Sequence, residues 1–147
     1  MEFFKLILGA LLTLAVGIVA LLLTKFFVDP LNEQKKIIAE IASALFYWAR
    51  VYANPIAPES SEAGEAERQL RSLAGKLVAA TAGIRPYWLG RWLGAPSQSA
   101  VGEAVEHLIA VSNGVRDSRA GTRNYTRANE VLACLRVKAT VTGLVSP

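Results

Sequence analysis

The residues best suited to chemistry lie in one short stretch that contains Glu103, Glu106 and His107. Carboxylates and histidines inside a helical bundle are typical of di-iron sites, which need Glu-x-x-His motifs on two helices. That spacing is absent, and His107 is the only histidine of the chain. We therefore interpret the stretch as a solvated helix face on which Glu103 and His107 pair one turn apart.

The second candidate for chemistry is Cys134, the only cysteine. A single cysteine excludes an intramolecular disulfide and offers no thiolate pair for a metal. Its neighbours Leu132, Ala133 and Leu135 predict a small buried thiol. The sequence contains no Gly-x-Ser-x-Gly motif and no glycine-rich phosphate loop. We expect no enzymatic activity, no metal and no cofactor.

Basic residues gather near the C-terminal end. The chain has 16 Lys and Arg against 12 Asp and Glu, and residues 112–147 hold six of the basic residues but only two acidic ones. Four arginines could bind the phosphates of anionic lipid headgroups, or they could simply be solvated. Nucleic acid is not expected as a partner because Tyr125 is the only aromatic residue nearby for base stacking. The four residues are Arg116, Arg119, Arg123 and Arg127.

An aromatic segment, residues 84–97, places Trp88, Arg91 and Trp92 close together between glycines and prolines. Tryptophan and arginine together suit a membrane interface or a contact with a protein partner. Large aromatic side chains are, however, mostly buried. We favour the interpretation that the two tryptophans cover the open end of a small helical bundle.

These residues must be positioned by a chain that begins with a long apolar run, Leu6 to Thr24. The run contains no charged residue, and as a helix it would cover about 28 Å, close to the hydrocarbon thickness of a bilayer. No small-x-small cleavage site follows it, so we expect an uncleaved anchor. Lys25, Lys35 and Lys36 follow the run and place that side in the cytoplasm by the positive-inside rule.

One face of the predicted span is built from small residues spaced by threes and fours. Such faces allow close approach of helix backbones in lipid. We expect self-association, or binding of another membrane protein, through this face. A narrow pore in a higher oligomer is the weaker alternative because no ionisable residue lies within the span. The face comprises Gly9, Thr13, Gly17, Ala20 and Thr24.

The remainder predicts an all-α domain of about four helices. Asp29-Pro30 is a helix-start signal, and the helix that follows should end near Ala53. The later elements are expected as a loop over 54–64, a second helix ending at Gly83, one or two turns within 84–97, a third helix from Ser97 or Ser99 to a C-cap at Asn113-Gly114, a loop over 116–123 and a last helix over 125–140. The domains are thus 1–28, the N-terminal tail and transmembrane helix, and 29–147, a cytosolic bundle.

The order of features resembles a group of small, uncharacterised bacterial single-span membrane proteins with a cytosolic helical domain. The resemblance rests on Asp29-Pro30 directly after the span, Asn54-Pro55, LRSLAGKLVA (70–79), IRPYW (84–88), APS (95–97) and EAVEHLIAVSNGV (103–115). It implies the architecture and carries over no functional residue.

The sequence therefore predicts a non-enzymatic, membrane-anchored helical module for protein interaction or oligomerisation. It would lie in the inner or plasma membrane with its N-terminus outside, and its partners would be the bilayer and itself or another protein. The alternative is an oligomerising membrane effector that perturbs or opens the bilayer once assembled.

Overall fold

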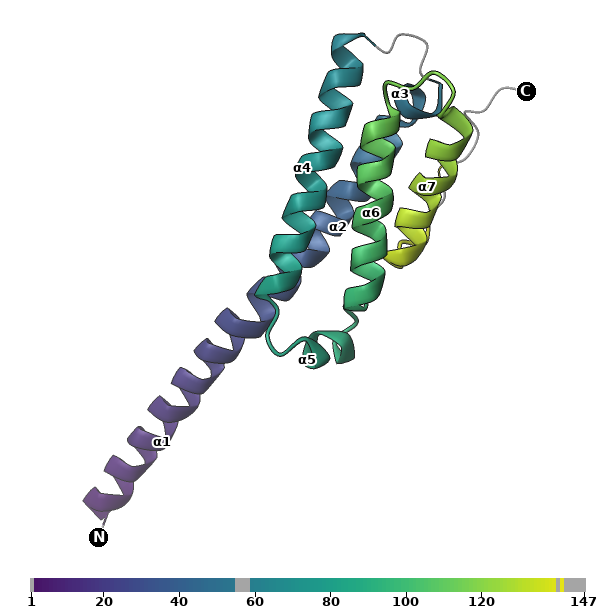
Figure 1. The fold of residues 1–147 in the computed structure, drawn as a ribbon. Helices are drawn as coiled ribbons and strands as arrows, with labels where there is room; N and C mark the ends of the chain where they lie inside the picture. The colour runs from purple at the N-terminus through teal and green to yellow at the C-terminus, as the bar shows by residue number, and fades with distance from the viewer. Residues whose placement is uncertain (1, 55–58, 140, 142–147) are drawn as a thin grey trace.

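The computed structural model describes residues 2–54, 59–139 and 141, and its regular elements are all helices. A single helix of 46 residues, Glu2–Tyr47, dominates the fold. It consists of α1 (Glu2–Leu23), a π-helical turn η1 (Thr24–Val28) and α2 (Asp29–Tyr47). In Figure 1, α1 projects from the rest of the molecule as a rod, and α2 continues that rod into a bundle.

Helix α2 starts at Asp29 as predicted, but Asp29 is not its N-cap, because the helix runs on from the span without a break. Val28 and Asp29 both have right-handed helical backbone angles, and no side chain caps the start of α2. The backbone N–H of Asp29 instead donates to the carbonyl of Thr24, five residues earlier. Proline 30 cannot donate to Phe26 and its ring would crowd that carbonyl, so a wider π turn just before it lets the helix continue. Helices α1 and α2 are therefore parts of one continuous helix.

Among the described residues, five further helices follow the rod. They are α3 (Ala49–Ala53), α4 (Ser61–Gly83), α5 (Tyr87–Trp92), α6 (Gln98–Gly114) and α7 (Gly121–Cys134). Serine side chains cap two of them: Ser60 accepts from Ala63 N at 3.2 Å, and Ser97 accepts from Ala100 N at 3.1 Å. The N-cap at Ser97 is as predicted. Helix α4 starts inside the predicted loop.

The last helix differs most from its prediction. It begins at Gly121, before the expected start at Tyr125, and it ends at Cys134. Arg136 has a left-handed backbone with φ of 59°, so the chain leaves the helix well short of residue 139. Thr140, the predicted end, lies outside the described residues.

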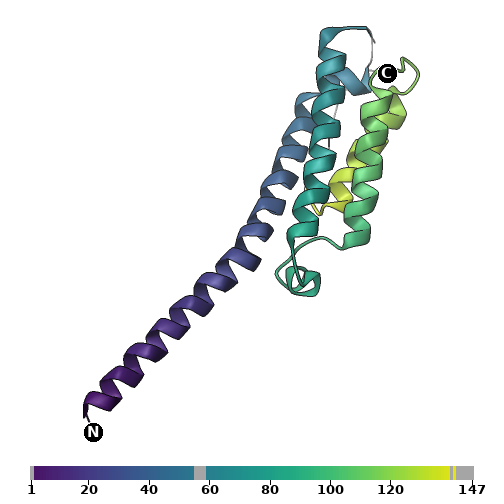
Figure 2. The ribbon, with the colours of Figure 1, turned by 60° about the vertical axis from the view of Figure 1, so that its left-hand side comes forward.

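Helices α2, α4, α6 and α7 run side by side and enclose the core, and α3 packs against α7 (Figures 1 and 2). Tyr52 of α3 is fully buried, and its hydroxyl donates to Leu45 O at 2.8 Å. Two large apolar side chains of these helices are exposed, Val78 of α4 at 52% and Ile109 of α6 at 38%. The most deeply buried aliphatic side chains are Ile41, Leu45, Leu70, Leu77, Leu108, Val111, Val115, Val131 and Leu132.

Gly114 is not the predicted left-handed C-cap. It is the last residue of α6 in ordinary helical geometry, and Val115 after it is also right-handed. A Cβ on Gly114 would meet the side chain of Asn124, within 2.9 Å of its Cγ. The buried Asn124 amide donates to the carbonyls of Gly114, at 2.9 Å, and Tyr52, at 3.1 Å. Glycine is therefore needed here because three helices meet at one side chain.

Candidate functional site

The acidic stretch with the histidine does not form the predicted intrahelical pair. His107 Nδ1 lies 3.2 Å from Glu130 Oε2 on α7, so the contact joins two helices. Glu103 instead approaches the Cys134 sulfur at 3.8 Å, and Glu106 is exposed. Within residues 2–54, 59–139 and 141, no three His, Cys, Asp or Glu side chains gather closely enough to hold a metal ion.

Cys134, the last residue of α7, is half-buried. Burial raises the pKa of its thiol, and the neighbouring Glu103 carboxylate raises it further. Both effects keep the sulfur protonated near neutral pH, whereas a nucleophilic cysteine needs a lowered pKa. The environment is that of a packing residue.

The arginines around the α6–α7 connection are partly paired with acids of this chain. Arg116 Nε donates to Glu67 Oε2 at 2.8 Å, and Arg123 lies 3.2 Å from Asp117. The hydrogen bond from Arg116 is the main reason that the pKa of Glu67 is lowered. Arg119 is exposed and Arg127 is half-buried.

Position further limits what these arginines can contact. Arg116 pairs with Glu59, just before α4, and with Glu67 near the start of α4, whereas the other end of α4, at Gly83, lies beside Pro30 of the rod. Helix α4 is about 35 Å long by the rise of an α-helix, several times the screening length at physiological salt. A bilayer around α1 would therefore exert little attraction on the arginine loop, and headgroup binding there remains an untested prediction.

The two tryptophans of α5 do not cover the bundle core. Trp88 is 70% exposed and Trp92 is 80% exposed, so the interpretation that they close the bundle is wrong. They lie one turn apart on the outer side of α5, and Arg91 between them is also exposed. The inner side of this helix carries Gly90, where a Cβ would come within 2.9 Å of Ile84.

The small-residue face of α1 is open along its length. No residue of α1 is buried, and a Cβ on Gly9 or Gly17 would meet nothing within 4 Å. Thr13 donates to Gly9 O and Thr24 donates to Ala20 O, each at 2.9 Å, so these hydroxyls are satisfied inside the helix. A shallow depression of about 620 Å³ includes Thr13 and Gly17, and its other lining residues are Ala10, Leu14, Ile18 and Leu21.

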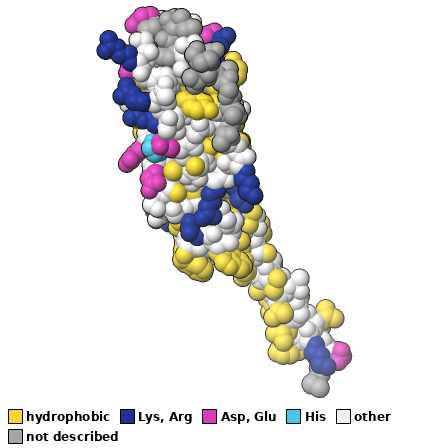
Figure 3. Space-filling view, turned by 90° about the vertical axis from the view of Figure 1, so that its right-hand side faces the viewer, with side chains coloured by type: hydrophobic (Ala, Val, Ile, Leu, Met, Phe, Trp, Pro, Cys, Tyr) yellow, Lys and Arg dark blue, Asp and Glu magenta, His cyan; other side chains and the backbone are white. Residues whose placement is uncertain are grey.

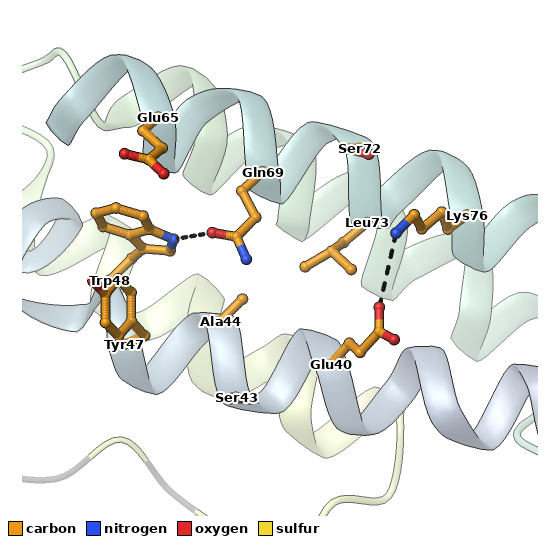
Figure 4. A pocket seen from close by; sticks show the side chains of 10 residues that line it. All are labelled: Glu40, Ser43, Ala44, Tyr47, Trp48, Glu65, Gln69, Ser72, Leu73 and Lys76. Carbon is orange, nitrogen blue, oxygen red and sulfur yellow. Dashed lines mark hydrogen bonds and ion pairs between the residues drawn. The ribbon is translucent and has the colours of Figure 1, made fainter. Parts of the chain in front are cut away.

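The sequence did not reveal a groove between α2 and α4, of about 520 Å³. Figure 4 shows Trp48 at one end, where its ring N–H donates to Gln69 Oε1 at 2.6 Å, and Lys76 paired with Glu40 at 3.9 Å toward the other end. The exposed ring of Tyr47 stands edge-on to Trp48. Ser43, Ala44, Glu65, Ser72 and Leu73 complete the lining.

The polar side chains that line this groove come from both of the helices that form it. Glu40 comes from α2, and Glu65 and Lys76 come from α4. The lining residues include the serines Ser43 and Ser72 but no histidine. A second depression adjoins it across Tyr47 and is lined also by Phe46, Arg50, Val51 and Glu62. The run of three aromatic residues Phe46, Tyr47 and Trp48 was a sequence signal for this region, but the exposure of Phe46 and Tyr47 depends on the packing of the helices.

No family model, curated protein or solved structure matches this chain.

Proposed function

We propose that this chain is a non-enzymatic, membrane-anchored helical module that binds protein partners, with α1 as its transmembrane helix. The observation that carries the proposal is the contrast within one helix. The segment Glu2–Tyr47 contains a window of mean hydropathy 2.9 with none of it buried, whereas α2 buries one face in the bundle. So much apolar surface on a rod has no partner among the described residues, and a bilayer is the environment that accepts it.

Association in the membrane is the second part of the proposal. The open face with Gly9 and Gly17 permits close backbone contact, and Thr13 and Thr24 need no polar partner from elsewhere. A second copy of this chain supplies the same face and can pack against it symmetrically. The exposed aromatic residues beside the α2–α4 groove then offer a protein-binding surface outside the lipid.

The test is amine-reactive crosslinking of the full chain in membranes, using Lys5 and Lys25, which flank the span. Gly9→Leu with Gly17→Leu should abolish the crosslinked dimer because two large side chains would separate the backbones. Ala15→Leu lies on the opposite helix face and serves as the matched control, which should crosslink like the wild type. A dimer that survives the double substitution would refute association through this face.

The domain is proposed to lie in the cytoplasm, because Lys25, Lys35 and Lys36 follow the span. Protease added to sealed inverted vesicles should cut within residues 54–60, which connect α3 to α4. Protection of that segment would reverse the orientation and leave the anchoring intact.

A further inference from the structure

Helix α5 lies at the end of the bundle from which the rod emerges, as Figures 1 and 2 both show. A small apolar cluster holds it there: Leu31 at the start of α2 packs with Ile84 and Ala95, which flank α5, and with Tyr87. The Tyr87 hydroxyl accepts from Gln34 at 3.3 Å and donates to Pro96 O at 2.7 Å. The position of α5 against the base of α2 is thus fixed by buried contacts.

Its outer side is apolar and uncovered. Trp88 and Trp92 are 70% and 80% exposed, and the next residue, Leu93, is 41% exposed. Figure 3 shows hydrophobic side chains at the lower end of the bundle beside the emerging rod, with Lys and Arg side chains directly above them. On the rod itself, Phe26 is exposed at the corresponding end of the span.

The distance along the rod places the base of α2 just beyond the membrane interface. Leu31, which contacts the α5 cluster, follows Thr24 by seven residues, or about 10 Å of helix. The headgroup layer is about 5–8 Å thick on each side of the hydrocarbon core. Since α5 extends from its contact with Leu31 toward α1, its outer side reaches the headgroup layer.

The chemistry of this end suits anionic lipid. The two segments that meet here, residues 25–36 and 84–97, carry five basic residues and two acidic ones. Arg85 precedes the exposed tryptophans and Arg91 lies between them, and no ion pair engages either arginine among the described residues. Tryptophan is enriched at the membrane interface because one end of its ring system is apolar and the other can donate a hydrogen bond.

We propose that α5 is a second membrane contact of this chain. Trp88, Trp92 and Leu93 insert between the headgroups of the bilayer that α1 crosses, and Arg85 and Arg91 contact lipid phosphates. This inference rests on the proposed anchoring of α1. The span alone would let the bundle tilt and rotate, whereas two contacts hold one side of the bundle, and therefore the α2–α4 groove, at a defined angle to the membrane.

The test uses tryptophan fluorescence of the full chain in vesicles of phosphatidylcholine and phosphatidylglycerol. Trp48→Phe leaves only the two α5 tryptophans as reporters. Lipids brominated near the headgroup should quench most of their emission, lipids brominated deep in the acyl chain should quench less, and iodide in the buffer should quench weakly. The matched control, Trp88→Phe with Trp92→Phe, retains Trp48 inside the bundle and should be insensitive to brominated lipid.

Should Trp48→Phe fail to fold, subtracting the control from the wild type gives the same signal, because the α5 substitutions alter only exposed rings. Strong iodide quenching with no effect of brominated lipid would overturn the inference. So would protection from both quenchers, which would mean that protein covers α5. Extraction with alkaline carbonate separates the two proposals: a chain that leaves the membrane refutes the anchoring, whereas a retained chain with iodide-accessible tryptophans refutes only the α5 contact.

Discussion

Gln34 is the buried polar residue that links α2 to α4 and α5, and its replacement gives a sharp prediction. The side chain is fully buried, and its Nε2 donates to Thr81 Oγ1 at 2.9 Å and to the Tyr87 hydroxyl at 3.3 Å. Each of these hydroxyls donates its own hydrogen bond to a backbone carbonyl, Thr81 to Leu77 O and Tyr87 to Pro96 O. The amide must therefore donate, and its Oε1 has no hydrogen-bond partner in the described part of the chain.

The magnitude follows from these contacts. Gln34→Met removes two hydrogen bonds, each with a net contribution of about 1 kcal/mol, and leaves no donor unsatisfied. It also removes a buried acceptor without a partner, which costs about 1–3 kcal/mol in the native chain. These effects nearly cancel, so the free energy of unfolding should change by about 1 kcal/mol or less. Gln34→Ala also leaves a cavity and should cost about 2–4 kcal/mol.

The assay is urea unfolding of the full chain in a mild detergent, followed by circular dichroism, with hydrogen exchange measured on the same variants. In Gln34→Met the global midpoint should remain close to that of the wild type. The backbone amides of α5 should exchange faster because Tyr87 has lost its hydrogen bond to α2. If Gln34→Met lowers stability as much as Gln34→Ala does, the two hydrogen bonds contribute far more than about 1 kcal/mol each, which would refute the expected cancellation.

Three further predictions concern two glycines of α6 and the ion pair between Arg116 and Glu67. Gly114→Ala should lower the free energy of unfolding by about 1–3 kcal/mol, because its Cβ would overlap the buried Asn124 amide. Gly102→Ala, also in α6 but with open space around it, should raise the same quantity by about 0.5–1 kcal/mol in the same unfolding experiment. The lowered pKa of Glu67 stabilises the fold above the ordinary carboxyl pKa, and that contribution should disappear as pH falls through the lowered pKa. Arg116→Gln should therefore make stability less dependent on pH in the acidic range. Melting temperatures measured at a series of acidic pH values would contradict this if they fell with pH as steeply as in the wild type.

The helical class, the long apolar rod and the cap at Ser97 were predictable because each depends on local sequence. Apolar periodicity could not show which of two neighbouring residues would be buried. Ile37 is buried, whereas Ile38 is only partly buried. It also gave no sign that Gln34 would be buried, because a buried amide depends on partners distant in sequence, here Thr81 and Tyr87.

The exposure of Trp88 and Trp92 could not be read from composition, since hydrophobic residues are drawn equally to a core and to a membrane surface. Gly114 was misassigned for a related reason. Asn-Gly after an apolar run is a common helix terminus, and only the approach of Asn124 from α7 shows why glycine is required there. In both cases the deciding neighbour is distant in sequence.

The π turn at Thr24–Val28 affects how the span is rotated about the helix axis relative to the bundle. Such a turn holds one residue more than the corresponding α-helical turn, and one residue corresponds to about 100° of rotation about the helix axis. The azimuth of the small-residue face relative to the bundle is therefore set by those five residues. If two spans associate through that face, each bundle is presented to its neighbour on one defined side, and the unbroken helix transmits any turning of the span directly to α2.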